Sequence, residues 1–355
     1  MILKETFTKK HIEEIIKNKK CDPIILERAI VAIGLVEALV KTGCNFIFKG
    51  GSSLMLLLNE VNRLSTDCDI IVPVDYDIDK YIKDASVIYP FKSFSESIRK
   101  TNNNISKKHY RFVYESIYSN NGEVIILLDV LFEDDVYKNI INKEIKNSLL
   151  LCDDNPIYVK CPTVEAILGD KLTAFAPETT GIRFYNDDFS NDKRLEVIKQ
   201  FYDIATLFRN SFNFNEIRDN YLNVVKNEII YRGLDITYKD SLMDTFNSSL
   251  SILSRGKICS TNYSNFLDGI KKIRNHILGQ SFTAETAVNY ASDVLLITAG
   301  ILANVDVINT IIPDGKPFVD SIYKNINYVR TRKMSKNSFN KASYSICILK
   351  EKGII

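Results

Sequence analysis

The sequence predicts an α/β (α+β) protein in which a mixed sheet flanked by helices is followed by a helical C-terminal domain. In the first part of the chain, short β-branched or aromatic runs alternate with helical periodicity; these runs are 45–49 (NFIFK), 68–74 (CDIIVPV) and 123–132 (EVIILLDVLF). Beyond about residue 160, apolar residues recur at spacings of three and four, which is typical of amphipathic helices. We therefore expect two domains, residues 1–160 and residues 161–355.

The predicted elements follow in order along the chain. Helices are predicted in the first 43 residues, with Gly43 as the stop signal. A strand at 45–49 ends at a Gly-Gly pair, and a helix at 52–58 follows before the next two strands. The stretch 93–109, rich in Ser, Asn and Lys, is predicted to be a solvated connection or a mobile loop. The C-terminal helices are predicted at 163–175, 193–209, 214–228, 261–278 and 283–304.

Composition excludes several classes of function. The chain has 46 Lys and Arg and 44 Asp and Glu residues, so its formal charge of +2 argues neither for nor against a nucleic-acid partner. Seven scattered cysteines without a C-x-x-C pair, and three distant histidines, argue against a zinc site. The longest apolar run, 294–303, is shorter than the roughly 20 residues that cross a bilayer. We expect a cytoplasmic protein with no membrane partner.

The pattern that indicates chemistry begins where the first strand meets a helix. Lys49 ends the strand, Gly50-Gly51 turns the chain, and Ser52-Ser53 begins the helix. Glycine lets backbone N–H groups approach a phosphate, a helix N-terminus attracts anions, and the serine hydroxyls can add donors. Taken alone, such a pair of glycines is as often only a turn. A P-loop is excluded, because the chain has no G-x-x-x-x-G-K-[ST] sequence.

Two carboxylates follow this turn. Asp67 and Asp69 are two positions apart at the next predicted strand, and strand periodicity places both on one face. Carboxylates this close repel each other unless a cation lies between them, and Mg²⁺ binds carboxylate oxygens together with substrate phosphates. The alternative for such a pair by itself is a solvated strand edge or turn.

A third carboxylate lies on the apolar strand at 123–132. Asp129 is a lone charge in this run, which is costly without a partner, so it is the candidate that completes a three-carboxylate site. Glu133, Asp134 and Asp135 follow directly, and the sequence leaves them open as alternatives for the third metal ligand.

Two segments together resemble a known family. Gly50–Leu54 (GGSSL) and Arg63–Asp69 (RLSTDCD) are similar to the GG[ST]-x-L and R-x-S-x-D-x-D motifs of the DNA polymerase β nucleotidyltransferase superfamily. The resemblance is to its AbiEii/AbiGii toxin branch of type IV toxin–antitoxin systems, although the spacing between the two motifs is slightly longer than usual. It implies a polymerase β-like core that binds an NTP with Mg²⁺ (or Mn²⁺) and releases pyrophosphate. Arg63 and Ser65 then belong to the nucleotide-binding pattern; otherwise they are loop residues.

Two further segments extend the resemblance to about residues 45–210. Ala166–Phe175 (AILGDKLTAF) is similar to the branch's second signature, which implies that Lys171 contacts the nucleotide phosphates. Lys199–Ile204 (KQFYDI) is similar to its K/R-x-x-x-D-[IL] signature, which implies a nucleotide-binding role for Lys199 and a catalytic role for Asp203.

Helical periodicity gives Lys171 independent support. It lies on the same predicted face as Ile167 and Leu168, where a lysine either snorkels or meets an anion, and phosphate is the anion we favour. Asp203 has a simpler alternative, a surface pair with Lys199 one turn back, which would contribute about 0.2–0.5 kcal/mol.

The acceptor is the least determined part of the prediction. Residues 321–350 contain seven Lys and Arg residues and no Asp or Glu, interleaved with Tyr323, Tyr328, Phe339 and Tyr344. This composition suits phosphate contacts and base stacking, and equally a solvated tail or helix face. Because some toxins of the branch add nucleotides to tRNA acceptor ends and so block translation, the resemblance implies a tRNA 3′ end as acceptor and a cognate antitoxin as partner. The alternatives are AMPylation of a protein, transfer to a small molecule, or a catalytically silent NTP-binding regulatory module.

Overall fold

The structure is a computed structural model that describes residues 1–97, 106–134, 137–186, 190–308, 312–319, 321–331 and 336–355. Its contacts divide the chain into two compact units. The first unit contains Met1–Thr163 together with Asn275–Ser281, and the second contains Val164–Arg274 and Phe282–Ile355. None of the described helices is long and apolar enough to cross a membrane.

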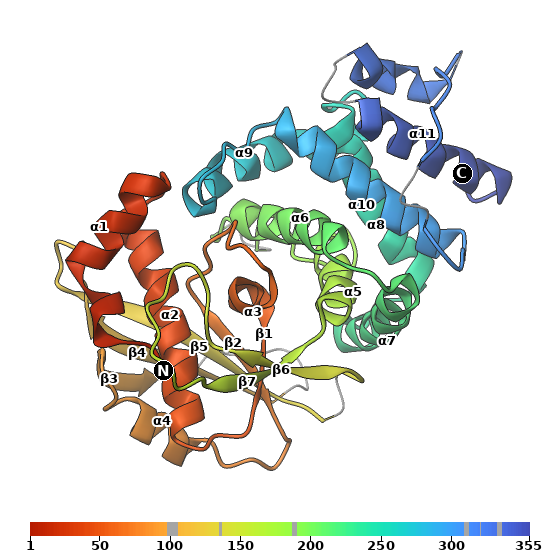
Figure 1. Ribbon diagram of the computed structural model, residues 1–355. Helices are drawn as coiled ribbons and strands as arrows, with labels where there is room; N and C mark the ends of the chain where they lie inside the picture. The colour runs from red at the N-terminus through yellow and green to blue at the C-terminus, as the bar shows by residue number, and fades with distance from the viewer. Residues whose placement is uncertain (98–105, 135–136, 187–189, 309–311, 320, 332–335) are drawn as a thin grey trace. The chain divides into compact units, whose positions relative to one another are not determined.

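A seven-stranded sheet in the described part of the chain forms the centre of the first unit (Figure 1). The strands are β1 Ile47–Lys49, β2 Cys68–Val72, β3 Phe91–Glu96, β4 Lys107–Glu115, β5 Glu123–Phe132, β6 Ile140–Glu144 and β7 Tyr158–Pro162. Their order is β3-β4-β5-β2-β1-β7-β6. β2 is parallel to β5 and β1 to β7, whereas the other neighbours are antiparallel. The predicted mixed sheet of an α/β (α+β) fold is therefore confirmed.

The prediction of a loop at 93–109 is wrong at both ends. β3 extends to Glu96 and β4 begins at Lys107, while residues 98–105 lie outside the described residues. In β4, the buried Tyr110, Phe112 and Tyr114 alternate with more exposed positions, which is the period of a half-buried strand. The Ser, Asn and Lys residues around this stretch concealed that period.

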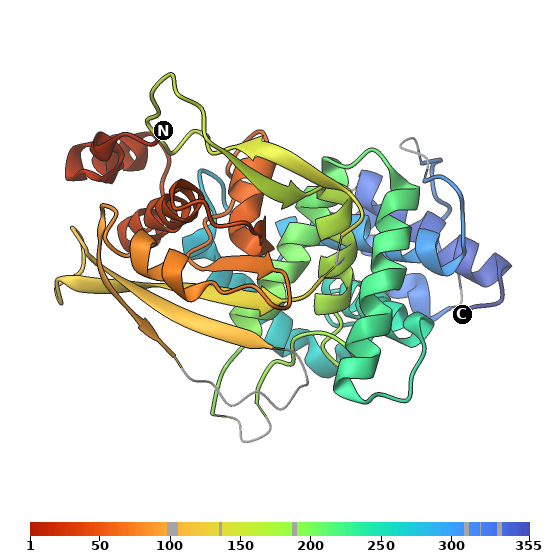
Figure 2. The ribbon, with the colours of Figure 1, turned by 90° about the horizontal axis from the view of Figure 1, so that it is seen from below.

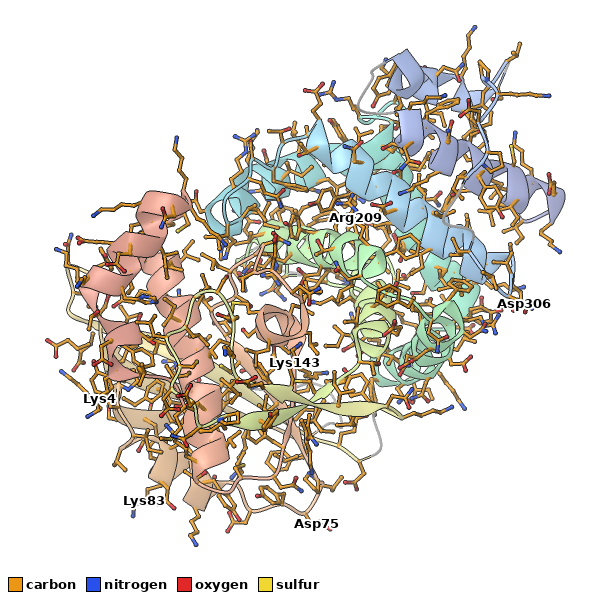
Figure 3. All side chains as sticks on the ribbon, in the orientation of Figure 1. Lys4, Asp75, Lys83, Lys143, Arg209 and Asp306 are labelled. Carbon is orange, nitrogen blue, oxygen red and sulfur yellow. The ribbon has the colours of Figure 1, made fainter. Side chains whose placement is uncertain are left out.

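Helix α2 (Pro23–Lys41) covers one face of the sheet and contacts β2, β5 and β7 (Figures 1 and 2). Asp22 caps it by accepting hydrogen bonds from the N–H groups of Ile24 and Ile25, and Pro23 occupies the first helical position. Both caps are readable in the sequence. The remaining helices of this unit are α1 Lys9–Asn18, α3 Gly50–Leu57 and α4 Asp79–Ala85. Lys4, Asp75 and Lys83 are exposed on the outside of the unit (Figure 3).

The second unit consists mainly of helices. They are α5 Val164–Ala174, α6 Arg194–Arg209, α7 Phe214–Arg232, α8 Tyr238–Leu253, α9 Tyr263–Ile273, α10 Thr286–Leu302 and α11 Lys336–Glu351. The five predicted helices correspond to α5, α6, α7, α9 and α10. α8 escaped prediction because polar residues lie on its buried side; Ser249, for example, donates its hydroxyl hydrogen to the Thr245 carbonyl at 2.8 Å.

The predicted helix at 261–278 is too long. α9 ends at Ile273, and the following residues return to the first unit, where they pair with the loop that precedes β2. Leu64 N–H donates to the His276 carbonyl at 2.7 Å, and Leu278 N–H donates to the Asn62 carbonyl at 2.9 Å. The predicted second domain, 161–355, includes Asn275–Ser281, whereas the contacts assign these residues to the first unit.

Candidate active site

Four polar side chains lie in one row across the middle of the sheet. Lys49 of β1 pairs with Asp69 of β2, Asp69 with Asp129 of β5, and Asp129 with His109 of β4. Residues in register on neighbouring strands project from the same face, so the four side chains share it. The sheet therefore brings together residues that are far apart in the sequence.

The opposite face is apolar at this position. Cys68 donates its S–H to the Ala32 carbonyl of α2 at 3.1 Å and is fully buried. Burial, and then the nearby carboxylates of Asp69, Asp67 and Asp129, raise the pKa of the Cys68 thiol well above its usual range. The thiol is therefore neutral and adds no charge to the site.

Asp69 packs directly on the glycine turn. Gly50 has φ +75°, and a Cβ at this position would lie 2.0 Å from Asp69 Oδ2. Gly50 begins α3, so the carboxylate lies at the positive end of a helix, where a negative charge is favourable. The turn needs glycine here both for its backbone conformation and for the approach of the carboxylate.

Gly51, the second glycine, leaves space for the side chains of Arg63 and Ser65, which form the R-x-S part of the second motif. A Cβ at Gly51 would lie 2.6 Å from Arg63 Nη2 and 2.8 Å from Ser65 Oγ. Arg63 is buried and donates from Nη1 to the Leu64 carbonyl at 3.2 Å. The structure thus brings the two motifs, which are separated in sequence, into contact at this turn.

The hydroxyl groups of Ser52 and Ser53 hold the turn together. Both side chains are fully buried. Ser52 donates to the backbone carbonyl of Asp67, and Ser53 donates to the Gly50 carbonyl at 2.9 Å. The expected use of these hydroxyls as phosphate donors stays a prediction, because in this structure Ser52 connects α3 to the residue before β2 and Ser53 bonds within the first turn of α3.

Asp67 lies just before β2, and its carboxylate approaches Arg28 of α2. Its Oδ1 is 3.7 Å from Arg28 Nη2, which is an ion pair without a hydrogen bond. Asp67 Oδ1 and Arg28 Nε are both buried and have no hydrogen-bond partner among the described residues. An unmet buried polar atom costs about 1–3 kcal/mol. A metal ion would satisfy the Asp67 oxygen, so this carboxylate fits one.

The carboxylates do not form a complete metal cage by themselves. Among the described residues, no group of three or more His, Cys, Asp or Glu side chains is arranged to hold a metal ion. Mg²⁺ commonly uses only one or two carboxylates and completes its coordination with water and substrate phosphates. The arrangement fits that kind of site, with the phosphates arriving at the adjacent glycine turn.

The register distinguishes the candidates for the third carboxylate. Asp129 is directly beside Asp69, whereas Glu133 N–H donates to the Val72 carbonyl at the far end of β2. At about 3.3 Å per residue, Glu133 and Asp134 are displaced by about 13 Å or more along the strands. Asp135 lies outside the described residues. Of the described acids, Asp129 is thus the neighbour of Asp69.

Sequence reasoning missed two residues of this region, Arg28 and His109. His109 Nδ1–H donates to Asp129 Oδ1 at 2.6 Å. The alternation of polar and aromatic residues in β4 was the available signal for His109. Arg28 gave no signal, because α2 carries apolar residues around its whole circumference and its side facing Asp67 is not marked by periodicity.

Lys171 and Asp203 pair with each other inside the second unit. Lys171 Nζ lies 2.9 Å from Asp203 Oδ2 and also donates to Gln200 Oε1 at 2.9 Å. The two side chains are only 7% and 2% exposed. Lys171 thus meets an anion, as predicted from its face of the helix, but that anion is a carboxylate. The alternative of a surface position for Asp203 is wrong, and Lys199 lies half-buried on the same helix.

The C-terminal aromatic residues are less available for base stacking than their sequence indicates. Tyr323 and Phe339 are buried and pack around Phe318. Lys350 Nζ lies 4.9 Å from the centroid of the Tyr323 ring. The prediction that these aromatic residues stack on nucleic-acid bases is therefore wrong for Tyr323 and Phe339. Arg332 and Lys333 lie outside the described residues.

Gly50→Ala should reduce the nucleotidyl transfer that the sequence predicts by about 100-fold, because displacing reacting groups by about 1 Å has costs of this size. The new methyl group would push Asp69 away from the turn. Gly43→Ala is the matched control, since Gly43 has φ +82° but nothing within 4 Å of its Cβ position. Both variants should lose about 1–2 kcal/mol of stability from backbone strain. Equal activity of the two variants in an initial-rate assay would contradict the role assigned to Gly50.

Comparison with known proteins identifies the family. A family model described as nucleotidyl transferase AbiEii toxin, type IV toxin–antitoxin system, matches residues 35–287. The structure is similar to MenT4, a nucleotidyltransferase toxin from Mycobacterium tuberculosis H37Rv, with a TM-score of 0.53, 11% identity, and coverage of 94% of this chain and 99% of that chain. An antigenic nucleotidyltransferase-like protein from Paracoccidioides brasiliensis has 16% identity, a TM-score of 0.34, and coverage of 58% of this chain and 91% of that chain.

No curated protein matches the sequence significantly. The similarity to MenT4 concerns the fold, because the identity is low, and the more distant similarity carries no argument. The family model, by contrast, spans most of the 355 residues, including the glycine turn, the D-x-D pair and the helices with Lys171 and Asp203. The chain therefore belongs to the AbiEii nucleotidyltransferase toxin family of type IV toxin–antitoxin systems.

Proposed function

We propose that this nucleotidyltransferase transfers NMP from an NTP to the 3′ end of tRNA, with divalent metal ions held by Asp67, Asp69 and Asp129. The observation that supports this most is the register of β2 and β5, which sets Asp69 beside Asp129, while Asp69 also packs on Gly50. Carboxylates for a metal ion and a helix N-terminus for a phosphate are thus adjacent.

The NTP would bind with its phosphates at the residues from Lys49 to Ser53. The first turn of α3 would direct backbone N–H groups toward the phosphate oxygens, and the glycines would permit the close approach. Lys49 lies in register with Asp69 and Arg63 packs on Gly51, so both add positive charge around the turn.

The acceptor hydroxyl would attack the α-phosphate in line, and pyrophosphate would leave. Metal ions in such a site neutralise the charge on the phosphates and lower the pKa of the attacking hydroxyl. Asp129, whose side chain is 42% exposed, lies beside Asp69 and is the residue we assign to the acceptor side. Asp67 and Asp69 are assigned to the nucleotide side, because both are tied to the glycine turn.

The phosphate-binding roles implied for Lys171 and Lys199, and the catalytic role implied for Asp203, stay predictions. The ammonium group of Lys171 is already bound to the carboxylate of Asp203. Contact with a phosphate would require it to exchange or share this partner. A cognate antitoxin is part of the proposal because the chain belongs to a toxin–antitoxin family.

The test uses purified protein, Mg²⁺ or Mn²⁺, each of the four α-labelled NTPs in turn, and total tRNA. An Asp67→Ala/Asp69→Ala variant is the control for the site, and periodate-oxidised tRNA is the control for the 3′ end. Label on intact tRNA, absent from both controls, is the expected result. Label on protein would replace tRNA as the acceptor, and NTP binding without any transfer would indicate a silent regulatory module.

A further inference from the structure

We propose that His109 is a positioning residue that holds Asp129 in the orientation needed for nucleotidyl transfer. The inference rests on the proposed function, because it assigns a role at the same site. No motif of the sequence singled out His109, and the pairing of β4 with β5 is what brings it to the carboxylates.

The contact is well defined. His109 and Asp129 are in register on antiparallel strands, and His109 Nδ1–H donates to Asp129 Oδ1 at 2.6 Å. The side chain of His109 is 11% exposed, whereas that of Asp129 is 42% exposed. Among the described residues, His109 is the hydrogen-bond partner of the Asp129 carboxylate. The ring is thus fixed in its surroundings, and it engages one oxygen of a carboxylate that is otherwise open.

The surroundings of Asp129 explain why such a contact is needed. On one side Asp69 presents a second negative charge, which repels the Asp129 carboxylate. Along β5, the residues on the same face are Leu127 and Leu131, which offer no hydrogen bond. An aspartate side chain can change among its staggered rotamers to escape the repulsion. The N–H of His109 opposes this, since it binds Oδ1 and leaves Oδ2 to a ligand.

If His109 only stabilised the sheet, its replacement would have a different effect. An ordinary cross-strand pair stabilises the sheet slightly and has no effect on catalysis beyond folding. A group that orients a metal ligand typically changes metal affinity or activity by about 10–100-fold. The two possibilities therefore differ in what is lost: His109→Ala should bind Mn²⁺ about 10–100-fold more weakly than the wild type, with nearly the same melting temperature.

Two conservative variants make the test specific. In His109→Asn the side-chain amide N–H lies near the position of Nδ1, so this variant should recover most of the lost Mn²⁺ affinity and kcat. In His109→Gln the amide lies near the position of Nε2, so this variant should resemble His109→Ala. A double-mutant cycle with Asp129→Asn completes the set, because a residue that acts through Asp129 causes no further loss once that carboxylate is gone.

Mn²⁺ binding to the full chain is measured by electron paramagnetic resonance, and kcat and KM by pyrophosphate release. The inference is overturned if His109→Ala binds Mn²⁺ like the wild type, if Asn and Gln behave alike, or if the losses from His109 and Asp129 multiply. If the wild type transfers no nucleotide, the proposed function fails, and the Mn²⁺ titrations alone decide on His109. A wild type that binds no Mn²⁺ overturns both.

Discussion

Asp69→Asn should lower nucleotidyl transfer by about 1,000-fold or more, since a carboxylate that holds the metal ion contributes several kcal/mol to the stabilisation of the transition state. Asp69 is the central residue of the row, because it is in register with both Lys49 and Asp129 and packs on Gly50. Asparagine has nearly the same shape, so it should fit the same space. Initial rates of pyrophosphate release, measured across a range of Mg²⁺ concentrations, check this expectation.

The fold should survive this change. In the metal-free protein, Asp69→Asn removes the repulsion by Asp129 but also the attraction of the α3 N-terminus, so the melting temperature should change little. Glu133→Gln is the matched control, because Glu133 follows the same strand pair at its other end, about 13 Å along β5. It should retain nearly full activity. A large loss in Glu133→Gln together with a small loss in Asp69→Asn would move the metal site to the other end of the strands.

Asp203→Ala should destabilise the second unit by about 3–5 kcal/mol, because it leaves a buried ammonium group without its carboxylate. Lys171 and Asp203 are 7% and 2% exposed, and Gln200, the other partner of Lys171, carries no charge. Urea unfolding of the full chain, followed by the loss of helical circular dichroism, measures the effect. Because the chain has two units, the two transitions must be fitted separately.

Asp268→Ala is the control for the Asp203 experiment. Asp268 forms an ion pair with Arg194 of α6, with 2.7 Å between Oδ2 and Nη1. The Asp268 side chain, however, is 40% exposed. Removal of an exposed pair costs about 0–1 kcal/mol. If Asp203→Ala unfolds at the same urea concentration as Asp268→Ala, the buried pair does not stabilise the unit.

The double variant Lys171→Met/Asp203→Leu separates stability from chemistry. Replacing both charges with apolar side chains should restore most of the lost stability, as is common for buried ion pairs. If Lys171 also contacts the nucleotide, this stable variant should still have a strongly raised KM for the NTP. Wild-type kinetics in the double variant would show that the pair is structural, and the predicted roles of Lys171 and Asp203 would be withdrawn.

The sequence was most informative where a structure depends on neighbouring residues. The strand at 123–132 was predicted with the bounds that β5 has, and the cap of Asp22 and Pro23 is readable directly. The glycine turn and the D-x-D spacing could be recognised for the same reason. Periodicity, caps and turns are properties of a few consecutive residues, so they leave a local pattern.

The sequence was less informative where polar residues occupy inward positions. β4 and α8 both escaped prediction, because serine, lysine and histidine made them resemble solvated segments. In α8 the hydroxyl groups of Thr245 and Ser249 are satisfied by carbonyl groups of the same helix, which lets them be buried. Composition cannot distinguish a hydroxyl that faces water from one that is satisfied inside a protein.

The sequence by itself determined the family, the mixed α/β first part followed by helices, and the two motifs that carry the chemistry. Only the tertiary structure decided which carboxylate lies beside Asp69, and that His109 binds it. It also decided that Lys171 pairs with Asp203 and that Asn275–Ser281 returns to the first unit. These outcomes depend on strand register and helix packing between segments far apart in the chain. Such pairing depends on both segments, so it cannot be predicted from the sequence of either segment alone.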